Sequence, residues 1–283
     1  MAETPGYILE ICNLYYSYDN RNNVLSDINL GIKKGEKIAI LGANGAGKST
    51  LFLNMNGVYN NRSGEIFLYG AKITRKNINT LRQNVGYVFQ EADSQIVGTT
   101  VLNEVSFGLA NLGLPESEIQ KRTISILKEM GLYNYKDKPP HYLSGGEKKR
   151  VAIAGVIAMQ PEIILFDEPM ASLDPGSSLM FENILAKLEN EGKTIIISTH
   201  NTDFAYKWAE RIIVLDNGSI IADDKPVKIF TSDEILKRAN LGKPMFLQVY
   251  EIIMKKYGKN LNTYGNAPKS INEFARWFNG LTI

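Results

Sequence analysis

The amino-acid sequence predicts an α/β fold with a mostly parallel core sheet. Short apolar runs typical of buried strands occur at residues 36–41, 162–167 and 193–198, and helical patterns separate them. Strands that alternate with helices favour parallel pairing, because each helix carries the chain back to the edge where the previous strand began. The first of these strands runs directly into a glycine-rich loop, and we expect a helix at residues 49–56 after it.

The remaining elements follow from the same periodicities. The first 35 residues are expected to form strands, because apolar residues alternate at residues 27–32. The sequence further predicts strands at 64–69 and 85–89, helices between 99 and 159 and at 176–190, and a hairpin over 212–222 that turns at Asn217-Gly218. We therefore expect a domain over residues 1–224, with a helical subdomain inserted at about 90–160, and a small helical appendage over residues 225–283.

The composition argues against several functional classes. Lys and Arg number 32 and Asp and Glu number 30, so no excess of positive charge favours nucleic acid as a partner. Cys12 is the single cysteine of the sequence, so no internal disulfide can form. The longest apolar stretch, at residues 151–159, is far shorter than the roughly 20 residues that a membrane span needs. We expect a soluble chain without a signal peptide, whose membrane role comes only through partner subunits.

The segment Gly42-Ala43-Asn44-Gly45-Ala46-Gly47-Lys48-Ser49 has the G-x-x-x-x-G-K-S spacing of a P-loop. Its glycines let backbone N–H groups converge on phosphate oxygens, and the start of the following helix adds partial positive charge. Lys48 is expected to reach the β- and γ-phosphates, and Ser49 is expected to ligate Mg²⁺. The alternative is an accidental glycine-rich turn, but the position between a buried strand and a helix favours nucleotide binding.

Two carboxylates, Asp167 and Glu168, end the apolar strand at residues 162–167. An acid at the carboxyl end of a parallel strand beside a P-loop lies where Mg²⁺ needs a counter-charge. We therefore assign Asp167 to Mg²⁺ and Glu168 to the general base that polarises the attacking water. A pair of solvated loop acids is the alternative.

The segment Ser144-Gly145-Gly146-Glu147 precedes a helix predicted at residues 148–159. One interpretation is a capping box, in which Ser144 caps the helix and Glu147 reaches back. The two glycines also leave N–H groups open to an outside anion. Within this sequence, the γ-phosphate of a second nucleotide is the group that would fill such a site.

Together with Leu143, this segment resembles the signature sequence of ABC ATPases, and we call residues 143–147 the signature segment. The other motifs of that family occur in the family's order between residue 7 and about residue 224. The resemblance implies the P-loop NTPase fold of ABC ATPases, in which the N-terminal strands are antiparallel. It also implies hydrolysis of ATP with Mg²⁺, and ATP contacts from residues 42–50, including Thr50. Glu147 stands where Gln is commoner, but Glu keeps the capping role and suits the helix dipole.

The resemblance also assigns one residue near the start of the chain and one directly after the strand predicted at 85–89. Tyr18 matches the aromatic residue that stacks on adenine, although Tyr15 or Tyr16 could serve instead. Gln90 matches the glutamine that touches Mg²⁺ and senses the transmembrane partner.

Two further residues are assigned in the second half of the chain. Residues 172–174 match the segment that crosses between protomers, with Asp174 as the nucleotide contact. The position of Asp174 before Pro175 is equally that of an ordinary helix cap. His200 matches the histidine that contacts the γ-phosphate, although a lone histidine is more often structural.

Closer resemblance narrows the type of transporter. Residues 89–96 and 100–108 are similar to the energy-coupling-factor branch of importers, and residues 139–155 and 208–211 look most like its cobalt and nickel ATPases. In that branch, C-terminal helices like those expected here support dimer contacts. One Cys and two separated His cannot build a Co²⁺ or Ni²⁺ site, so metal choice is expected in the membrane subunits. A vitamin importer of the same branch is the alternative.

The resemblance implies a homodimer at the cytoplasmic face of the cell membrane, bound to integral membrane transport subunits. The P-loop of one copy and the signature segment of the other would enclose each ATP. A non-transport ABC ATPase is a weaker alternative, because one cassette without long coiled coils does not match the translation or DNA-repair types. An unrelated P-loop kinase or GTPase would need neither the signature segment nor Asp174.

Overall fold

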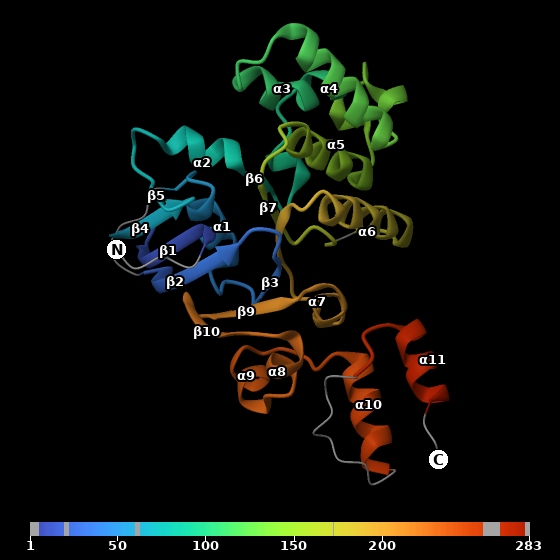
Figure 1. The fold of residues 1–283 in the computed structure, drawn as a ribbon. Coiled ribbons are helices and arrows are strands. Elements are labelled where there is room, and N and C mark those ends of the chain that lie inside the picture. Colours follow the sequence, from blue (N-terminus) through green and yellow to red (C-terminus); the bar gives the residue numbers. More distant parts are fainter. Residues whose placement is uncertain (1–5, 20–22, 60–62, 172, 257–266, 281–283) are drawn as a thin grey trace. The chain divides into compact units, whose positions relative to one another are not determined.

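The computed structural model describes residues 6–19, 23–59, 63–171, 173–256 and 267–280 (Figure 1). The chain forms two compact units, of which the first spans Met1–Glu36 and Ser49–Ser198 and the second spans Lys37–Lys48 and Thr199–Ile283. Each unit combines strands with helices, so the predicted α/β class is confirmed.

The first unit contains a four-stranded sheet in the order β2-β1-β4-β5. Its strands are β1 (Tyr7–Tyr16), β2 (Leu25–Lys33), β4 (Ser63–Leu68) and β5 (Ala71–Lys72). β1 pairs antiparallel with both β2 and β4, which confirms the antiparallel strands predicted at the start of the chain. β4 continues antiparallel into β5.

The same unit contains three parallel strands, β6 (Val85–Val88), β7 (Ile163–Asp167) and β8 (Thr194–Ser198). β7 pairs with β6 on one side and with β8 on the other. All residues of these strands are buried, as expected for parallel strands that are covered on both faces and therefore read as continuous apolar runs. The register places Asp167 opposite Ser198 at the carboxyl ends of β7 and β8.

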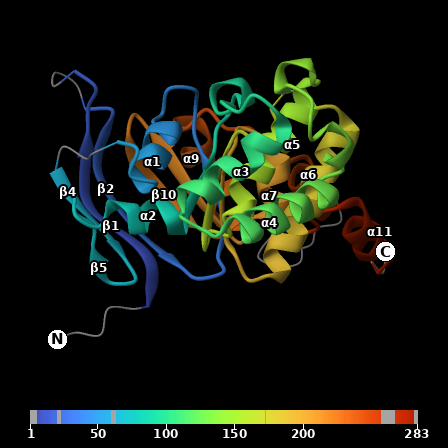
Figure 2. The same ribbon diagram turned by 90° about the horizontal axis from the view of Figure 1, so that it is seen from above.

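Most helices of the first unit occupy the segments where helical patterns were predicted, but α2 (Ile78–Asn84) was not predicted. The others are α1 (Lys48–Met55), α3 (Val101–Asn111), α4 (Glu116–Glu129), α5 (Gly145–Ala158) and α6 (Pro175–Asn190), with short 3-10 turns at Ala92–Ser94, Tyr133–Tyr135 and Pro140–Tyr142. α3, α4 and α5 contact one another and form a helical group, drawn in green in Figures 1 and 2. α5 begins earlier than the predicted residue 148, because Ser144 caps it directly at Gly145.

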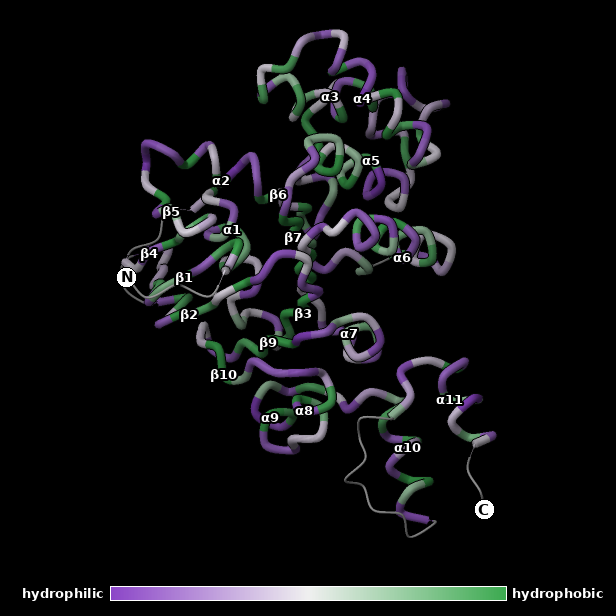
Figure 3. The backbone as a smooth tube through the Cα atoms, viewed as in Figure 1, coloured by the Kyte–Doolittle hydropathy of each residue, from purple (hydrophilic) through white to green (hydrophobic). Residues whose placement is uncertain are grey.

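The second unit is built on β3 (Lys37–Leu41), β9 (Arg211–Asp216) and β10 (Ser219–Asp224). β3 and β9 are parallel, and β9 and β10 form the predicted hairpin with Asn217 and Gly218 at the turn. Figure 3 shows the hydrophobic residues of β3 and β9 in green. The described residues of this unit also form the helices α7 (Thr202–Trp208), α8 (Pro226–Phe230), α9 (Asp233–Arg238), α10 (Met245–Lys256) and α11 (Ile271–Asn279).

The helices after Lys225 share an apolar core with the strands of the second unit. Phe230, Leu247 and Tyr250 are buried in one cluster with Leu41 and Val214. The C-terminal helices therefore pack as a continuation of this unit, and the predicted boundary at residues 224/225 stays a prediction.

Candidate functional site

The glycine-rich loop joins β3 to α1, as the sequence predicts. Gly42, Gly45 and Gly47 have φ values of 154°, 83° and 104°, a backbone region that favours glycine. At Gly42 an added Cβ would lie 2.4 Å from the carbonyl oxygen of Leu215, whereas at Gly45 it would meet open space. The loop therefore needs Gly42 for close backbone approach and Gly45 for its conformation.

The difference between these glycines gives a test of stability. Gly42→Ala should lower the free energy of unfolding by roughly 2–4 kcal/mol, because the methyl group collides with rigid backbone. Gly45→Ala is the matched control and should cost about 1 kcal/mol, since it adds only left-handed backbone strain. Denaturant unfolding of both variants checks this, and equal losses would contradict the assigned role of Leu215.

Lys48 lies over the loop that it follows. Its Nζ donates hydrogen bonds to the carbonyl oxygens of Gly42 at 2.8 Å and Ala43 at 3.2 Å. The residue is only 7% exposed. Burial holds the ammonium group at the loop, where it is available to an incoming phosphate group.

Tyr18 lies in an aromatic cluster near the first turn of α1. Its hydroxyl group and that of Thr50 are 2.9 Å apart, and its ring is 59% exposed. The ring centroids of Tyr16 and Tyr59 lie 5.2 and 5.7 Å from that of Tyr18, both in edge-to-face geometry. Tyr16 stacks on Tyr59 instead, so Tyr18 offers the more accessible ring face. Sequence reasoning missed Tyr59, which joins the cluster from a distant segment.

Asp167 is fixed by two hydroxyl groups at the end of β7. Ser198 donates to its Oδ1, and Tyr87 donates to its Oδ2 at 2.9 Å. Asp167 is 2% exposed. Burial and the neighbouring Asp167 raise the pKa of Tyr87 far above its usual range, so Tyr87 remains a hydrogen-bond donor. The sequence predicted the carboxylate but neither hydroxyl, because Tyr87 and Ser198 come from other strands.

Glu168 has an unusual backbone conformation for a residue with a side chain. Its φ is +43°, in the left-handed region, which costs roughly 1–2 kcal/mol for a non-glycine residue. Its N–H group lies 3.1 Å from the carbonyl oxygen and 3.0 Å from the hydroxyl group of Ser198. Such strain persists where surrounding contacts enforce it, and it is concentrated at functional sites.

Gln90 follows β6 and is exposed, and its backbone carbonyl group accepts a hydrogen bond from α5. Lys149 of α5 donates to the carbonyl oxygens of Phe89 at 2.9 Å and of Gln90 at 2.7 Å. Burial lowers the pKa of Lys149 to about 8, and the carboxylates of Asp167, Glu91 and Glu168 act in the other direction.

The signature segment forms the predicted capping box. Ser144 Oγ accepts a hydrogen bond from the Glu147 N–H group at 3.3 Å, and Glu147 Oε2 accepts from the Ser144 N–H group at 2.8 Å. The hydrogen bonds from Ser144 lower the pKa of Glu147 and keep it ionised. Ser144 and Gly145 are exposed, and an added Cβ at Gly145 would meet no atom within 4 Å. The outer side of this helix start is therefore open.

Asp174 lies close to the signature segment of the same chain. As the cap of α6, it accepts hydrogen bonds from the N–H group of Ser177 at 3.0 Å and from the Ser177 hydroxyl group at 2.6 Å. An added Cβ at Gly146 would lie 2.7 Å from Ser177 Oγ and 3.7 Å from Asp174 Oδ2. Gly146 therefore lets the first turns of α5 and α6 approach closely. Ser172 lies outside the described residues.

His200 is exposed at the start of the segment between β8 and α7. Its neighbour Thr199 donates its N–H group to the carbonyl oxygen of Ile40 at 3.1 Å, and Asn201 caps α7. These contacts fix the backbone on both sides of His200 within the second unit, which also contains the loop residues Gly42–Lys48.

A model of the ABC transporter family matches residues 25–171, more than half of the chain. The chain belongs to this family. It is an ABC ATPase. The matched region contains the glycine-rich loop, the signature segment, and the carboxylates Asp167 and Glu168 at the end of β7.

Known relatives support the same assignment. This ABC ATPase is 45% identical over 252 residues to an energy-coupling factor transporter ATP-binding protein, EcfA, of Methanocaldococcus jannaschii, covering 88% of this chain and 90% of that protein. The structure of cbiO1 from Clostridium perfringens, part of the ABC transporter complex cbiONQ, has a TM-score of 0.72 and 41% identity, covering 88% of this chain and 99% of that one.

A third similarity concerns a nucleotide-bound dimer. An ATP-binding cassette in a post-hydrolysis state, bound to ADP and Pi, has a TM-score of 0.69 and 30% identity to this ABC ATPase. The match covers 77% of this chain and 98% of that cassette. The P-loop fold predicted from the sequence is therefore confirmed.

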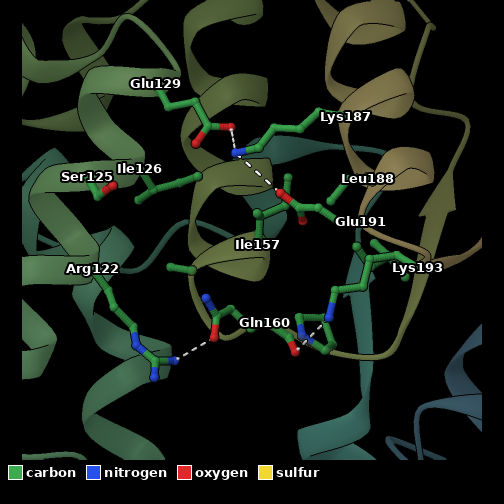
Figure 4. Close-up of a pocket in the computed structure, with 13 residues that line it drawn as sticks. Arg122, Ser125, Ile126, Glu129, Ile157, Gln160, Lys187, Leu188, Glu191 and Lys193 are labelled. Carbon is green, nitrogen blue, oxygen red and sulfur yellow. Dashed lines mark hydrogen bonds and ion pairs between the residues drawn. The ribbon is translucent and has the colours of Figure 1, made fainter.

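A separate cavity of about 180 Å³ lies in the first unit of this ABC ATPase, among α4, α5 and α6 (Figure 4). Arg122 donates to the side-chain oxygen of Gln160 at 3.1 Å, and Lys187 forms ion pairs with Glu129 and Glu191. Its lining residues all lie outside the predicted nucleotide-binding motifs. Arg122 and Lys193 also form ion pairs with Glu118 and Glu162 just outside the cavity. Because its cationic groups are all paired, we interpret it as a polar contact between helices.

Among the described residues, no helix of this ABC ATPase is both long and apolar enough to cross a bilayer. The same residues contain no group of three or more His, Cys, Asp or Glu side chains that could hold a metal ion.

Proposed function

We propose that this ABC ATPase powers the import of cobalt or nickel ions through separate membrane subunits, which makes it the energy-supplying part of a translocase. The relatives make it an ATP-binding subunit of an energy-coupling-factor transporter. The observation that carries the metal proposal is the segment at residues 139–155, which is similar to the cobalt and nickel ATPases. A single chain that contains every motif also suits a homodimer with two competent sites.

We propose that residues 42–50 bind the triphosphate and that Tyr18 stacks on the adenine. The positive φ values of the loop glycines turn backbone N–H groups towards a common point, and Gly42 leaves no room for a side chain. Lys48 would release its two carbonyl partners to bind the β- and γ-phosphates. The exposed ring of Tyr18 is the accessible face of its cluster.

The proposed Mg²⁺ ligands are Ser49, Gln90 and Asp167. All three offer oxygen atoms, which suits this hard cation, and the two hydroxyl donors orient the carboxylate of Asp167. When bound, Mg²⁺ would neutralise charge that develops on the phosphate oxygens.

Glu168 is the proposed general base. The contacts of its N–H group with Ser198 fix the backbone that carries its carboxylate, which would accept a proton from the attacking water. His200, exposed between two fixed neighbours, would donate a hydrogen bond to the γ-phosphate.

We propose that Ser144, Gly145 and Gly146 of one copy cover the nucleotide bound to the other copy. The exposure of Ser144 and Gly145 and the open space at Gly145 support this role, because an anion can approach the helix start. Asp174 would contact the nucleotide from the same side. The similarity to a dimeric cassette bound to ADP and Pi supports the dimer.

The membrane subunits would be engaged at the cytoplasmic face, with Gln90 and the helices after it transmitting the closure of the dimer. The driving force is the tighter binding of ATP to the closed dimer than to the open one. The chain itself would contact the membrane only through those subunits.

Uptake of radioactive Co²⁺ and Ni²⁺ by vesicles containing the complete transporter tests the substrate. We expect ATP-dependent accumulation of one of these ions, and loss of it in a Glu168→Gln complex. A vitamin is the second candidate, because the relatives named as energy-coupling factor ATPases fit it equally well. Accumulation of a labelled vitamin with no metal uptake would overturn the metal proposal while leaving the ATPase role intact.

A further inference from the structure

The backbone around Gln90 is tied to the helix that the signature segment begins. Lys149 Nζ donates to two successive carbonyl oxygens, those of Phe89 at 2.9 Å and Gln90 at 2.7 Å. Lys149 lies in the second turn of α5, whose cap is Ser144. One ammonium group thus connects the Gln90 segment to this helix.

The side chain of Gln95 also links the segment before Gln90 to α5. Gln95 Oε1 accepts a hydrogen bond from the N–H group of Phe89 at 3.0 Å, and Gln95 Nε2 donates to the carbonyl oxygen of Ala152 at 2.9 Å. Lys149 and Ala152 are three residues apart and so share one face of α5. Phe89 is consequently held through both its N–H group and its carbonyl group.

The position of Lys149 is unusual for its residue type. Lysine is rarely fully buried, yet Lys149 is only 5% exposed. Removing an ammonium group from water is costly unless its donors are satisfied. The two carbonyl oxygens satisfy Lys149, and the carboxylates of Glu91, Asp167 and Glu168 stabilise its charge. Lys149 is therefore a buried part of the contact between α5 and the Gln90 segment.

We propose that Lys149 and Gln95 are positioning residues that fix Gln90 to the signature helix α5. The backbone at Gln90 and the signature segment would then move as one body. Gln90 is proposed to sense the nucleotide of its own copy, while the signature segment covers the nucleotide of the second copy. Lys149 would therefore link the two nucleotide sites of the dimer. This inference rests on the proposed function.

The test measures ATP hydrolysis and ATP binding by the full-length protein. Lys149→Met keeps the length and burial of the side chain but removes its donors. We expect kcat to fall roughly ten- to a hundredfold, because displaced catalytic groups lose their alignment. The Kd for ATP should stay within about twofold, since the glycine-rich loop is unchanged. Lys149→Arg retains N–H donors and should recover part of kcat.

A double-mutant cycle separates positioning from general destabilisation. If Lys149 acts through Gln90, Lys149→Met should reduce kcat little further in a Gln90→Ala background. Lys187→Met is the matched control: it breaks ion pairs to Glu129 and Glu191 away from Gln90, and its effect should be small and additive. Gln95→Met should reproduce the non-additivity and decides the question if Lys149→Met does not fold.

Each outcome has a distinct meaning. Additive losses in the double variants, or wild-type kcat in Lys149→Met, would overturn the positioning role. Failure of the unmodified protein to bind or hydrolyse ATP in the same assay would instead overturn the proposed function.

Discussion

Replacing Glu168 by Gln is expected to lower kcat for ATP hydrolysis by roughly a hundred- to ten-thousandfold, the range for loss of a general base. The amide has nearly the same shape as the carboxylate but cannot accept a proton from water. The backbone contacts of Glu168 with Ser198 involve only its N–H group, so the local structure should persist. ATP should still bind and should hold two copies together, because the ligand shared between them is no longer consumed.

Steady-state hydrolysis and size-exclusion chromatography with ATP measure these two effects. Glu162→Gln is the matched control, since it makes the same chemical change at a carboxylate paired with Lys34 and Lys193. That variant should hydrolyse ATP at close to the wild-type rate. If Glu168→Gln does the same, Glu168 is not the base.

Replacing Ser144 by Arg is expected to abolish ATP-dependent dimer formation while ATP binding by the single copy persists. Ser144 is exposed, so the monomer has room for a larger side chain. The Arg side chain would occupy the space that a second copy's nucleotide must enter. Hydrolysis should fall at least about a hundredfold, because the site is never completed.

Loss of the helix cap is a separate effect of this substitution. Ser144→Ala removes the same hydroxyl group without adding bulk and should cost about 1 kcal/mol of stability. Comparing the two variants by analytical ultracentrifugation with ATP isolates the steric block. Normal ATP-dependent dimer formation by Ser144→Arg would contradict the proposal that the signature segment of one copy covers the nucleotide bound to the other.

Local sequence patterns predicted the features that depend on neighbouring residues. Continuous apolar runs located β7 and β8, because parallel strands are buried on both faces. The spacing of Ser144 and Glu147 predicted the capping box, since its hydrogen bonds span only three residues. The glycine-rich loop and its helix were predicted for the same reason.

Local sequence patterns did not predict contacts between segments that are distant in the sequence. Nothing in the spacing indicates that Tyr87 and Ser198 hold Asp167, because strand order brings them together. The burial of Lys149 was also not predicted, since a lysine beside other charged residues at the start of a helix normally indicates a solvated face. The left-handed backbone of Glu168 has no sequence signal either, because Glu does not favour that conformation.

The close approach of α5 and α6 at Gly146 limits which residues can replace this glycine. A Cβ at position 146 would collide with the hydroxyl group of Ser177 from within the same chain. The absence of a side chain at this position is thus favoured by packing within one chain. A larger residue at position 146 would require residue 177 to become smaller or to move, so we expect the effects of substitutions at these two positions on stability to be non-additive.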